Sequence, residues 1–325
     1  NPLTYACYLG DQPPTYTTSY PGYSFPPNVP FFKCPVEGTP TTAPTLTSLT
    51  GCINRMEPSS ACGSGSIRIE PTLTAIGDYA FYQSSIVTAN FTGCARLTTI
   101  GSYAFSETAL GAVHLPSALT SIGDSAFDGC YQLSSVTFPS SLTSIGDRAF
   151  CNNRLDSLSN LPTQLTYIGI AAFAANQLTS ITFPSSLTYI GERAFYYNQL
   201  NSLSSLPSQL GFIGPEAFSG NRLTSITLPS SLTALGYSAF SGNKLKSVTL
   251  PSSLTTIPVS AFSGNRLSEI SIPSTVTQIE SGAFGGNQIS RVVIPSSVVT
   301  IGPSAFANNP LTYACYLGDQ PPTYT

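Results

Sequence analysis

The dipeptide Ala-Phe recurs through most of this chain at a nearly constant interval. Its phenylalanines stand at positions 81, 105, 127, 150, 173, 195, 218, 240, 262, 284 and 306, and successive ones are 22 to 24 residues apart. A period of about 20–29 residues is typical of a leucine-rich solenoid, in which no single repeat can bury its apolar residues alone. The spacing therefore predicts a mainly β leucine-rich-repeat solenoid of about 11–12 rungs, with little α-helix.

One rung illustrates how the side chains are expected to divide between core and solvent. In the segment LTSITLP, Leu223, Ile226 and Leu228 should face the core, while Ser225 and Thr227 should face outward. Proline ends the strand because it cannot donate to the ladder. An Ile-Gly pair then begins the second side of the solenoid, where the glycine is expected to allow a tight backbone turn. Two rungs carry proline or glutamate in its place, so the glycine should be favourable but not essential.

These rungs resemble the BspA-type leucine-rich repeat, known from surface proteins of oral bacteria and treponemes. The resemblance is carried by the pattern LPSSLTxIGxxAFxxNxLTSIT and covers roughly Ile67 to Leu317. It implies a solenoid fold and a surface location. It implies no single activity, because members of the family include adhesins and other binding proteins.

An asparagine lies three residues after most of the repeated phenylalanines. A buried amide offers both donors and an acceptor, so the row predicts a structural ladder between rungs rather than a row of ligand-binding groups. Cys130 takes the same position in its rung. The predicted ladder comprises Asn153, Asn176, Asn198, Asn221, Asn243, Asn265, Asn287 and Asn309.

The sequence NPLTYACYLGDQPPTYT occurs twice, at residues 1–17 and again at 309–325, an offset of 308 residues. The simplest interpretation is one unit, plus an overlap, of a longer tandem array. Residues 1–9 would be the last strand of the preceding copy, and 10–66 a Pro/Tyr/Cys-rich connector and cap. Residues 67–317 would form the solenoid, and 318–325 would begin the next connector.

The cysteines indicate an oxidising environment, because a connector without its own core is usually stabilised by disulfides. Cys130 and Cys151 lie on adjacent rungs and within expected disulfide reach. Zinc is the competing interpretation, which the absence of a CxxC pair disfavours. The candidate disulfide cysteines are Cys7, Cys34, Cys52, Cys62, Cys94, Cys130, Cys151 and Cys315.

Composition argues against several function classes. Charged residues make up only 8% of the chain and the net charge is −3, so there is no basic surface for nucleic acid. No apolar run is long enough to span a membrane. The single histidine, His114, has no catalytic partner in sight, and we expect neither an enzyme nor a bound cofactor or metal. Asn90 begins the only glycosylation sequon.

Three functions fit these features. The first is a structural subunit of an extracellular filament, with copies of the chain itself as partners. The alternative is a cell-surface adhesin or ligand-binding module that contacts host or matrix molecules, although the outward Ser/Thr columns carry few distinctive groups before Glu269, Arg291 and Tyr313. The remote alternative is an ice-binding solenoid, which regular threonine rows would favour more than the mixed Ser and Thr found here.

Overall fold

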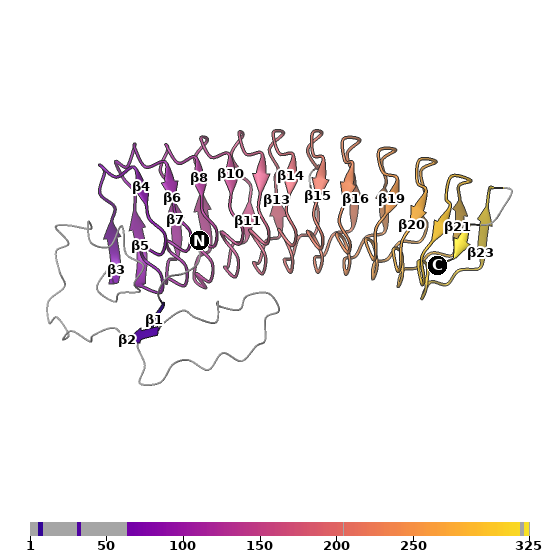
Figure 1. The fold of residues 1–325 in the computed structure, drawn as a ribbon, viewed down its shortest axis with the longest axis horizontal. Coiled ribbons are helices and arrows are strands. Elements are labelled where there is room, and N and C mark those ends of the chain that lie inside the picture. Colours follow the sequence, from indigo (N-terminus) through magenta and orange to yellow (C-terminus); the bar gives the residue numbers. More distant parts are fainter. Residues whose placement is uncertain (1–5, 9–30, 34–63, 204, 319–321, 325) are drawn as a thin grey trace.

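The computed structural model describes residues 6–8, 31–33, 64–203, 205–318 and 322–324. From Ser64 onward the described chain winds into an elongated solenoid of about 11 turns, built of short strands and turns (Figure 1). No helix occurs in the described part of the chain. The mainly β solenoid predicted from the Ala-Phe spacing is confirmed.

Two rows of strands run along the solenoid, and every pairing in them is parallel. The first row carries the outward Ser/Thr columns and comprises β3 (Ser64–Arg68), β5 (Ser85–Asn90), β7 (Ala112–His114), β9 (Ser135–Thr137), β11 (Ser157–Leu158), β13 (Ser180–Ile181), β16 (Ser225–Thr227), β18 (Ser247–Thr249), β21 (Arg291–Ile294) and β23 (Tyr313–Tyr316). The second row precedes the Ala-Phe pairs and comprises β4 (Ala75–Ile76), β6 (Thr99–Ile100), β8 (Ser121–Ile122), β10 (Ser144–Ile145), β12 (Tyr167–Ile168), β14 (Tyr189–Ile190), β15 (Phe212–Ile213), β17 (Ala234–Leu235), β19 (Thr256–Ile257), β20 (Gln278–Ile279), β22 (Thr300–Ile301) and β24 (Thr323–Tyr324).

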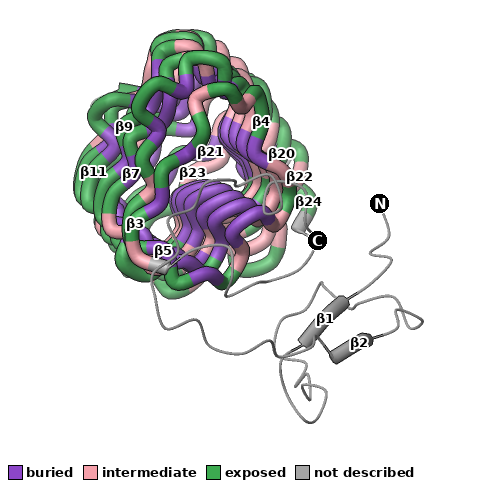
Figure 2. The backbone as a smooth tube through the Cα atoms, turned by 90° about the vertical axis from the view of Figure 1, so that its left-hand side faces the viewer, coloured by how far each residue is buried: buried purple, intermediate pink, exposed green. Residues whose placement is uncertain are grey.

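Strand alternation places the side chains as the sequence predicts. Leu223, Ile226 and Leu228 are buried, whereas Ser225 and Thr227 on β16 are exposed. Viewed from one end, the buried residues line the inside of the coil and the exposed ones its outer surface (Figure 2). The apolar positions of all rungs merge into one continuous core.

The repeated phenylalanines form a single column inside this core. Neighbouring rings, from Phe81 to Phe306, have centroids 4.9–5.7 Å apart and planes within 20° of parallel. Each ring therefore packs on the ring of the next rung, which adds a stacking contribution to the burial of its area.

Hydroxyl groups link the rungs at two further positions. The second serine of the Pro-Ser-Ser turn donates to a carbonyl of the preceding rung, as Ser186 Oγ does to Leu165 O at 2.7 Å and Ser231 Oγ to Leu210 O at 2.8 Å. The threonine before the second strand does the same, as Thr188 Oγ1 does to Thr166 O at 3.2 Å. Much of the Ser/Thr content therefore satisfies backbone groups between rungs, beyond simply forming a polar surface.

The glycine of the Ile-Gly pair is favoured by the close approach of successive rungs. A Cβ added to Gly191 would lie 2.6 Å from the Gly169 carbonyl carbon, and one added to Gly123 would lie 2.7 Å from that of Gly101. These glycines do not have positive φ angles. The expected tight turn is therefore the wrong reason for the glycine, and lack of space is the right one.

Pro258 interrupts the second row of strands. At the other rungs this position donates its N–H to the preceding rung, as Gly236 N does to Ile213 O at 2.8 Å and Glu280 N to Ile257 O at 2.9 Å. Proline has no N–H to donate. An eight-stranded sheet accordingly ends at β17 and a separate four-stranded sheet begins at β19.

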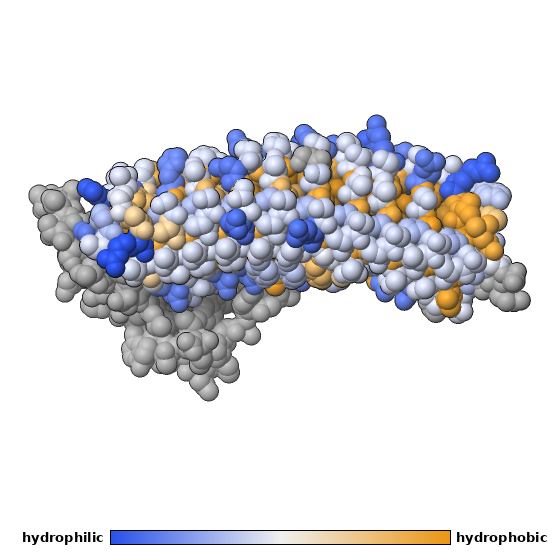
Figure 3. All heavy atoms as spheres, turned by 90° about the horizontal axis from the view of Figure 1, so that it is seen from above, coloured by the Kyte–Doolittle hydropathy of each residue, from blue (hydrophilic) through white to orange (hydrophobic). Residues whose placement is uncertain are grey.

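Few strongly hydrophilic side chains show on the surface seen in Figure 3, and apolar residues gather there at the C-terminal end. Val293, Val299, Tyr313 and Leu317 are exposed near that end.

The second row of strands extends to β24, beyond position 317. Near the other end of the chain, β1 (Ala6–Tyr8) pairs in parallel with β2 (Phe31–Lys33). Most of the predicted connector lies outside the described residues, and the domain boundaries stay predictions.

A glycine-to-alanine pair of variants tests the role of close rung approach. Gly191→Ala should lower the free energy of unfolding by roughly 1–3 kcal/mol, because its Cβ meets backbone rather than a movable side chain. Gly111→Ala is the control, since nothing lies within 4 Å of the added Cβ. Its effect should stay within about 0.5 kcal/mol. Equal effects in chemical denaturation would contradict the argument.

Candidate functional site at the corner after the Ala-Phe pairs

The predicted asparagine row lies at the corner that follows each Ala-Phe pair, and it links each rung to the one before. The Nδ2 of all eight residues donates to the phenylalanine carbonyl of the preceding rung at 2.8–2.9 Å. In seven of them, Oδ1 accepts the N–H of a leucine or isoleucine of the preceding rung at 2.9–3.1 Å. The amides therefore supply hydrogen-bond partners for backbone groups that would otherwise be buried without one.

The first three rungs depart from this rule. The position that asparagine occupies elsewhere is held by Ser84, Thr108 and Cys130, all of them buried. Thr108 Oγ1 and Cys130 Sγ both donate to Phe105 O, at 2.9 and 3.1 Å. Ser84 Oγ has no hydrogen-bond partner. Sequence analysis placed Cys130 correctly but missed the other two, whose signal was the same three-residue offset from Phe81 and Phe105.

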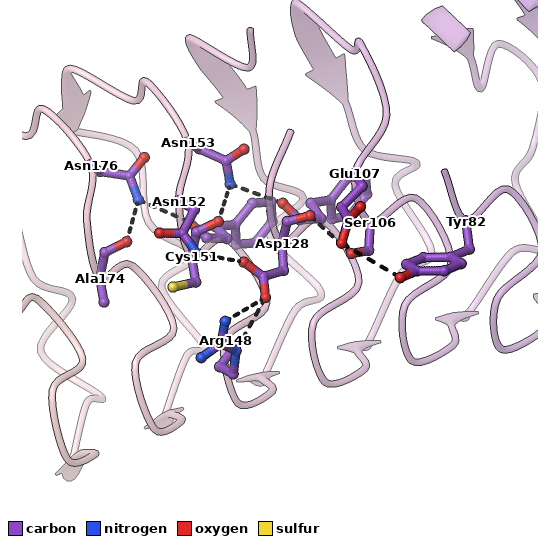
Figure 4. A network of polar contacts seen from close by, with 12 residues as sticks. Tyr82, Ser106, Glu107, Asp128, Arg148, Cys151, Asn152, Asn153, Ala174 and Asn176 are labelled. Atoms are coloured by element: carbon purple, nitrogen blue, oxygen red, sulfur yellow. Dashed lines mark hydrogen bonds and ion pairs between the residues drawn. The ribbon is translucent and has the colours of Figure 1, made fainter. Parts of the chain in front are cut away.

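We call residues 82–85, 106–109, 128–132 and 148–153 the N-terminal corner. Figure 4 shows that Arg148 and Asn152 converge there on Asp128. Arg148 Nη2 and Nε donate to Asp128 Oδ2 at 2.8 and 3.1 Å, and Asn152 Nδ2 donates to Oδ1 at 3.1 Å. Burial alone would lower the pKa of Arg148, but the Asp128 carboxylate raises it above its ordinary value. This partly exposed ion pair joins two adjacent rungs at the corner.

A second polar group lies one rung further toward the N-terminus. Gln83 Nε2 donates to Glu107 Oε2 at 2.8 Å and to the Tyr82 hydroxyl oxygen at 3.2 Å. Burial, followed by the neighbouring Glu107 carboxylate, raises the pKa of Tyr82. The Tyr82 hydroxyl therefore keeps its proton at physiological pH and points it toward Glu107.

An open surface depression of about 320 Å³ lies beside this group. Its lining includes Gln83, Ser84, Glu107, Thr108, Tyr131 and Gln132. Tyr131 is 63% exposed at its rim. Arg154 Nη1 donates to Gln132 Oε1 at 3.3 Å and holds that side chain in place.

The expected disulfide between Cys130 and Cys151 does not form, because the two side chains occupy different environments. Cys130 lies in the asparagine row and belongs to the main core, whereas Cys151 packs with Ala171 and Ala174 in a small separate cluster. Cys94, Cys130 and Cys151 are buried free thiols, and Cys315 is a half-buried one. Cys34, Cys52 and Cys62 lie outside the described residues, as does the side chain of Cys7, so their oxidation stays a prediction.

The remaining sequence-predicted residues lie apart from the corner. His114 is exposed on the first strand row, with Nδ1 3.0 Å from Thr137 Oγ1. Asn90 is exposed, and its Oδ1 accepts the Thr92 N–H at 2.8 Å. Arg291 lies over the ring of Tyr313, with its guanidinium carbon 4.8 Å from the ring centroid. The N-terminal corner takes in none of these three sites.

Acidic side chains beside the Ile-Gly pairs satisfy backbone N–H groups of the following rung. Asp78 Oδ1 accepts the Ser102 N–H at 2.7 Å, and Asp147 Oδ1 accepts the Ile170 N–H at 2.7 Å. Within the described residues, no group of three or more His, Cys, Asp or Glu side chains could hold a metal ion. No helix of a length and apolarity that would cross a bilayer occurs among them either.

Comparison with known proteins identifies the family. The BspA type leucine-rich repeat region matches in six copies, over residues 60–110, 98–210 and 194–312. The chain belongs to this family of leucine-rich repeat proteins. No curated protein matches it.

Solved structures with similar folds include three bacterial leucine-rich repeat proteins. A leucine-rich cell surface protein from Faecalibacterium prausnitzii is 28% identical, with 79% of this chain and 80% of that chain covered and a TM-score of 0.49. The pneumococcal vaccine antigen PcpA is 25% identical, with 76% and 69% covered and a TM-score of 0.50. A leucine-rich repeat protein from Bacteroides ovatus is 23% identical, with 77% and 72% covered and a TM-score of 0.58.

Replacing one ladder asparagine should destabilise the fold. Asn221→Ala removes the bonds to Phe195 O and Phe218 O and leaves the buried Leu200 N–H unpaired. We expect a loss of about 2–3 kcal/mol in the free energy of unfolding. Asn201→Ala, on an exposed side chain, should change it by less than about 0.5 kcal/mol. Comparable losses in urea denaturation would contradict the structural role.

The two buried thiols of the corner should resist alkylation in the folded protein. Burial raises the pKa of Cys130 to about 11 and that of Cys151 to about 12. Thiolate is the reactive form, so at pH 8 each should react at least about 100-fold more slowly with iodoacetamide than an ordinary exposed cysteine. Modification should become rapid in denaturant. Mass spectrometry of native protein showing both thiols fully alkylated within minutes would contradict this assignment.

Proposed function

We propose that this chain is a recognition module of a cell-surface protein, acting as an adhesin or ligand-binding unit rather than as an enzyme. Membership of the BspA-type family supports this proposal, as does the partial likeness to PcpA, which is described as a vaccine antigen. An extracellular location also agrees with a surface of low charge, since charged residues make up 8% of the chain.

The observation that carries the proposal is the departure of the N-terminal corner from an otherwise regular scaffold. Eight rungs carry an asparagine that donates to the phenylalanine carbonyl of the preceding rung, whereas the first three carry Ser84, Thr108 and Cys130 at that position, and an open surface depression lies beside the first two. Function on repeat folds lies in sites that depart from the repeat, because the repeat itself serves stability.

Two tyrosines of nearly equal exposure allow a matched test. Tyr131 is 63% exposed at the corner, and Tyr197, two residues after Phe195, is 61% exposed on a later rung. The full chain, labelled with a fluorophore, is titrated onto epithelial cells and onto immobilised extracellular matrix. Saturable binding that Tyr131→Ala weakens about 10-fold and Tyr197→Ala leaves unchanged is expected; a 10-fold change corresponds to 1.4 kcal/mol.

The absence of saturable binding to either surface would overturn the proposal. Equal losses in both variants would place the contact away from the corner. Circular dichroism melting of each variant separates lost binding from lost folding.

A second candidate function, a structural subunit of a tandem filament, is favoured by the duplicated segment. Its second copy supplies β23 and β24, which extend both strand rows, and its first copy also forms a strand at Ala6–Tyr8. Exposed Leu311 and Leu317 flank β23, the last strand of the first row, where a following unit would attach. The mass of the native polypeptide after reduction tests this: several 308-residue units are expected, and a single unit would contradict it.

A further inference from the structure

We propose that the C-terminal end of the solenoid is closed by a further rung from a following copy of the chain, whose segment Phe31–Lys33 pairs in parallel with β23. This inference rests on the second candidate function, the tandem filament, and it names the contact by which one unit joins the next. It is carried by the uncovered last rung, by the strands that the duplicated sequence forms and by the register between them.

The last rung leaves side chains exposed at positions that the preceding rungs bury. Leu311 is 37% exposed, whereas Leu267 and Ile289, at the same position of the two preceding rungs, are fully buried. Ala314 on β23 is exposed, whereas its ladder partner Val292 is buried. An open solenoid end of this kind needs a closing rung that covers the core and the strand edge.

The edge of β23 also has ladder donors without a strand to receive them. β23 lies at the C-terminal end of the first row (Figure 1), and within the described residues it pairs on one side only, with β21. Tyr313 and Leu317 donate their N–H groups back to that preceding rung, at Ser290 O and Ile294 O. Backbone groups alternate between the two sides of a strand, so the alternate N–H groups of this strand face the open side.

The duplicated sequence already extends one of the two strand rows. β24 pairs in parallel with β22, with Thr323 opposite Thr300 and Tyr324 opposite Ile301. In sequence, β24 equals residues 15–16 of a following copy, because residues 309–325 repeat residues 1–17. The first part of one unit's connector thus adds a strand to the solenoid before it.

The other copy of the same sequence indicates how the first row continues. β1 pairs in parallel with β2, with Ala6 opposite Phe31. The sequence of β1 is that of Ala314–Tyr316, which belongs to β23. The same pairing applied to β23 therefore sets Phe31 of a following copy opposite Ala314.

The spacing between these two strands is that of a rung. Ala6 and Phe31 are 25 residues apart, close to the 22 to 24 residues between successive repeated phenylalanines. Residues 15–16 lie between them and supply the strand of the second row, so the order along the chain is first row, second row, first row, as it is throughout the solenoid. An unstructured linker would have no reason to keep this spacing and order.

The sequence of β2 suits the last rung of a stack. The pairing assigns Phe31 to the column of the buried Val292, and Lys33 to the column of the buried Ile294. A lysine ends this apolar column, and Pro35 follows two residues later. Lysine and proline at a strand edge discourage further pairing, so the stack of one unit ends at this rung.

The test extends the full chain at its C-terminus by a copy of residues 18–33, in the order in which they follow Thr17. We expect the amide hydrogens of Ala314 and Tyr316 to exchange at least about 10-fold more slowly than in the chain of 325 residues, because ladder hydrogen bonds protect them. The melting temperature should rise as well, since the added rung covers the open end. Exchange is followed residue by residue by NMR.

Three controls belong to this experiment. The amides of Tyr313 and Leu317, which already bond to the preceding rung, should change little and report that the solenoid is folded. An extension with the same residues in scrambled order should protect neither Ala314 nor Tyr316. Phe32→Pro in the appended segment removes a ladder donor and should abolish the protection.

Unchanged exchange at Ala314 and Tyr316 in the extended chain, or equal slowing by the scrambled extension, would overturn the inference. The mass of the native polypeptide tests the filament separately. If it shows several units while the extension protects neither amide, the closing rung fails and the filament stands. If it shows a single unit, no following copy exists and both fail.

Discussion

Hydrogen bonds from side chains of one rung to backbone groups of its neighbour are the interaction on which this solenoid depends. Each rung ends in tight corners whose peptide groups no sheet can pair, and buried peptide groups must find partners. Asparagine amides supply them after the Ala-Phe pairs, and Ser and Thr hydroxyls supply them at the other turns. The chain can therefore carry few charged residues, because these hydrogen bonds between rungs are made by neutral hydroxyl and amide groups.

The same dependence explains why a change of side chain in the ladder has local consequences. Pro258 removes one backbone donor and splits the second strand row into two sheets, while the phenylalanine column continues across the break, with Phe240 and Phe262 5.7 Å apart. Ser84 and Thr108 shorten the ladder side chain, yet both stay buried and the stack from Phe81 to Phe127 stays intact. A repeat scaffold thus tolerates local departures, because each rung is held by several independent contacts.

The fold could be predicted from the sequence because the repeat fixes it many times over. Alternation along LTSITLP and the spacing of Ala-Phe each point to the same buried positions, and the asparagine offset locates the ladder. The candidate site could not be predicted in this way. In the sequence, Ser84 resembles any surface serine, and only the repeat register places it in the asparagine position. The repeat spacing puts Cys130 and Cys151 on adjacent rungs, but it does not show that their side chains pack in different clusters. The reason for glycine at the Ile-Gly pair could be found only from the short distances between successive rungs.

A crystal structure of the ligand-free protein, at a resolution that shows ordered solvent, tests the central claim most directly. The claim is that side-chain amides of one rung satisfy backbone groups of the rung before it. The account predicts Asn221 Nδ2 within hydrogen-bonding distance of Phe195 O and Asn221 Oδ1 within that distance of Leu200 N, with the corresponding contacts at the other ladder asparagines. Ladder amides turned to solvent, with ordered water on the phenylalanine carbonyls in their place, would contradict it.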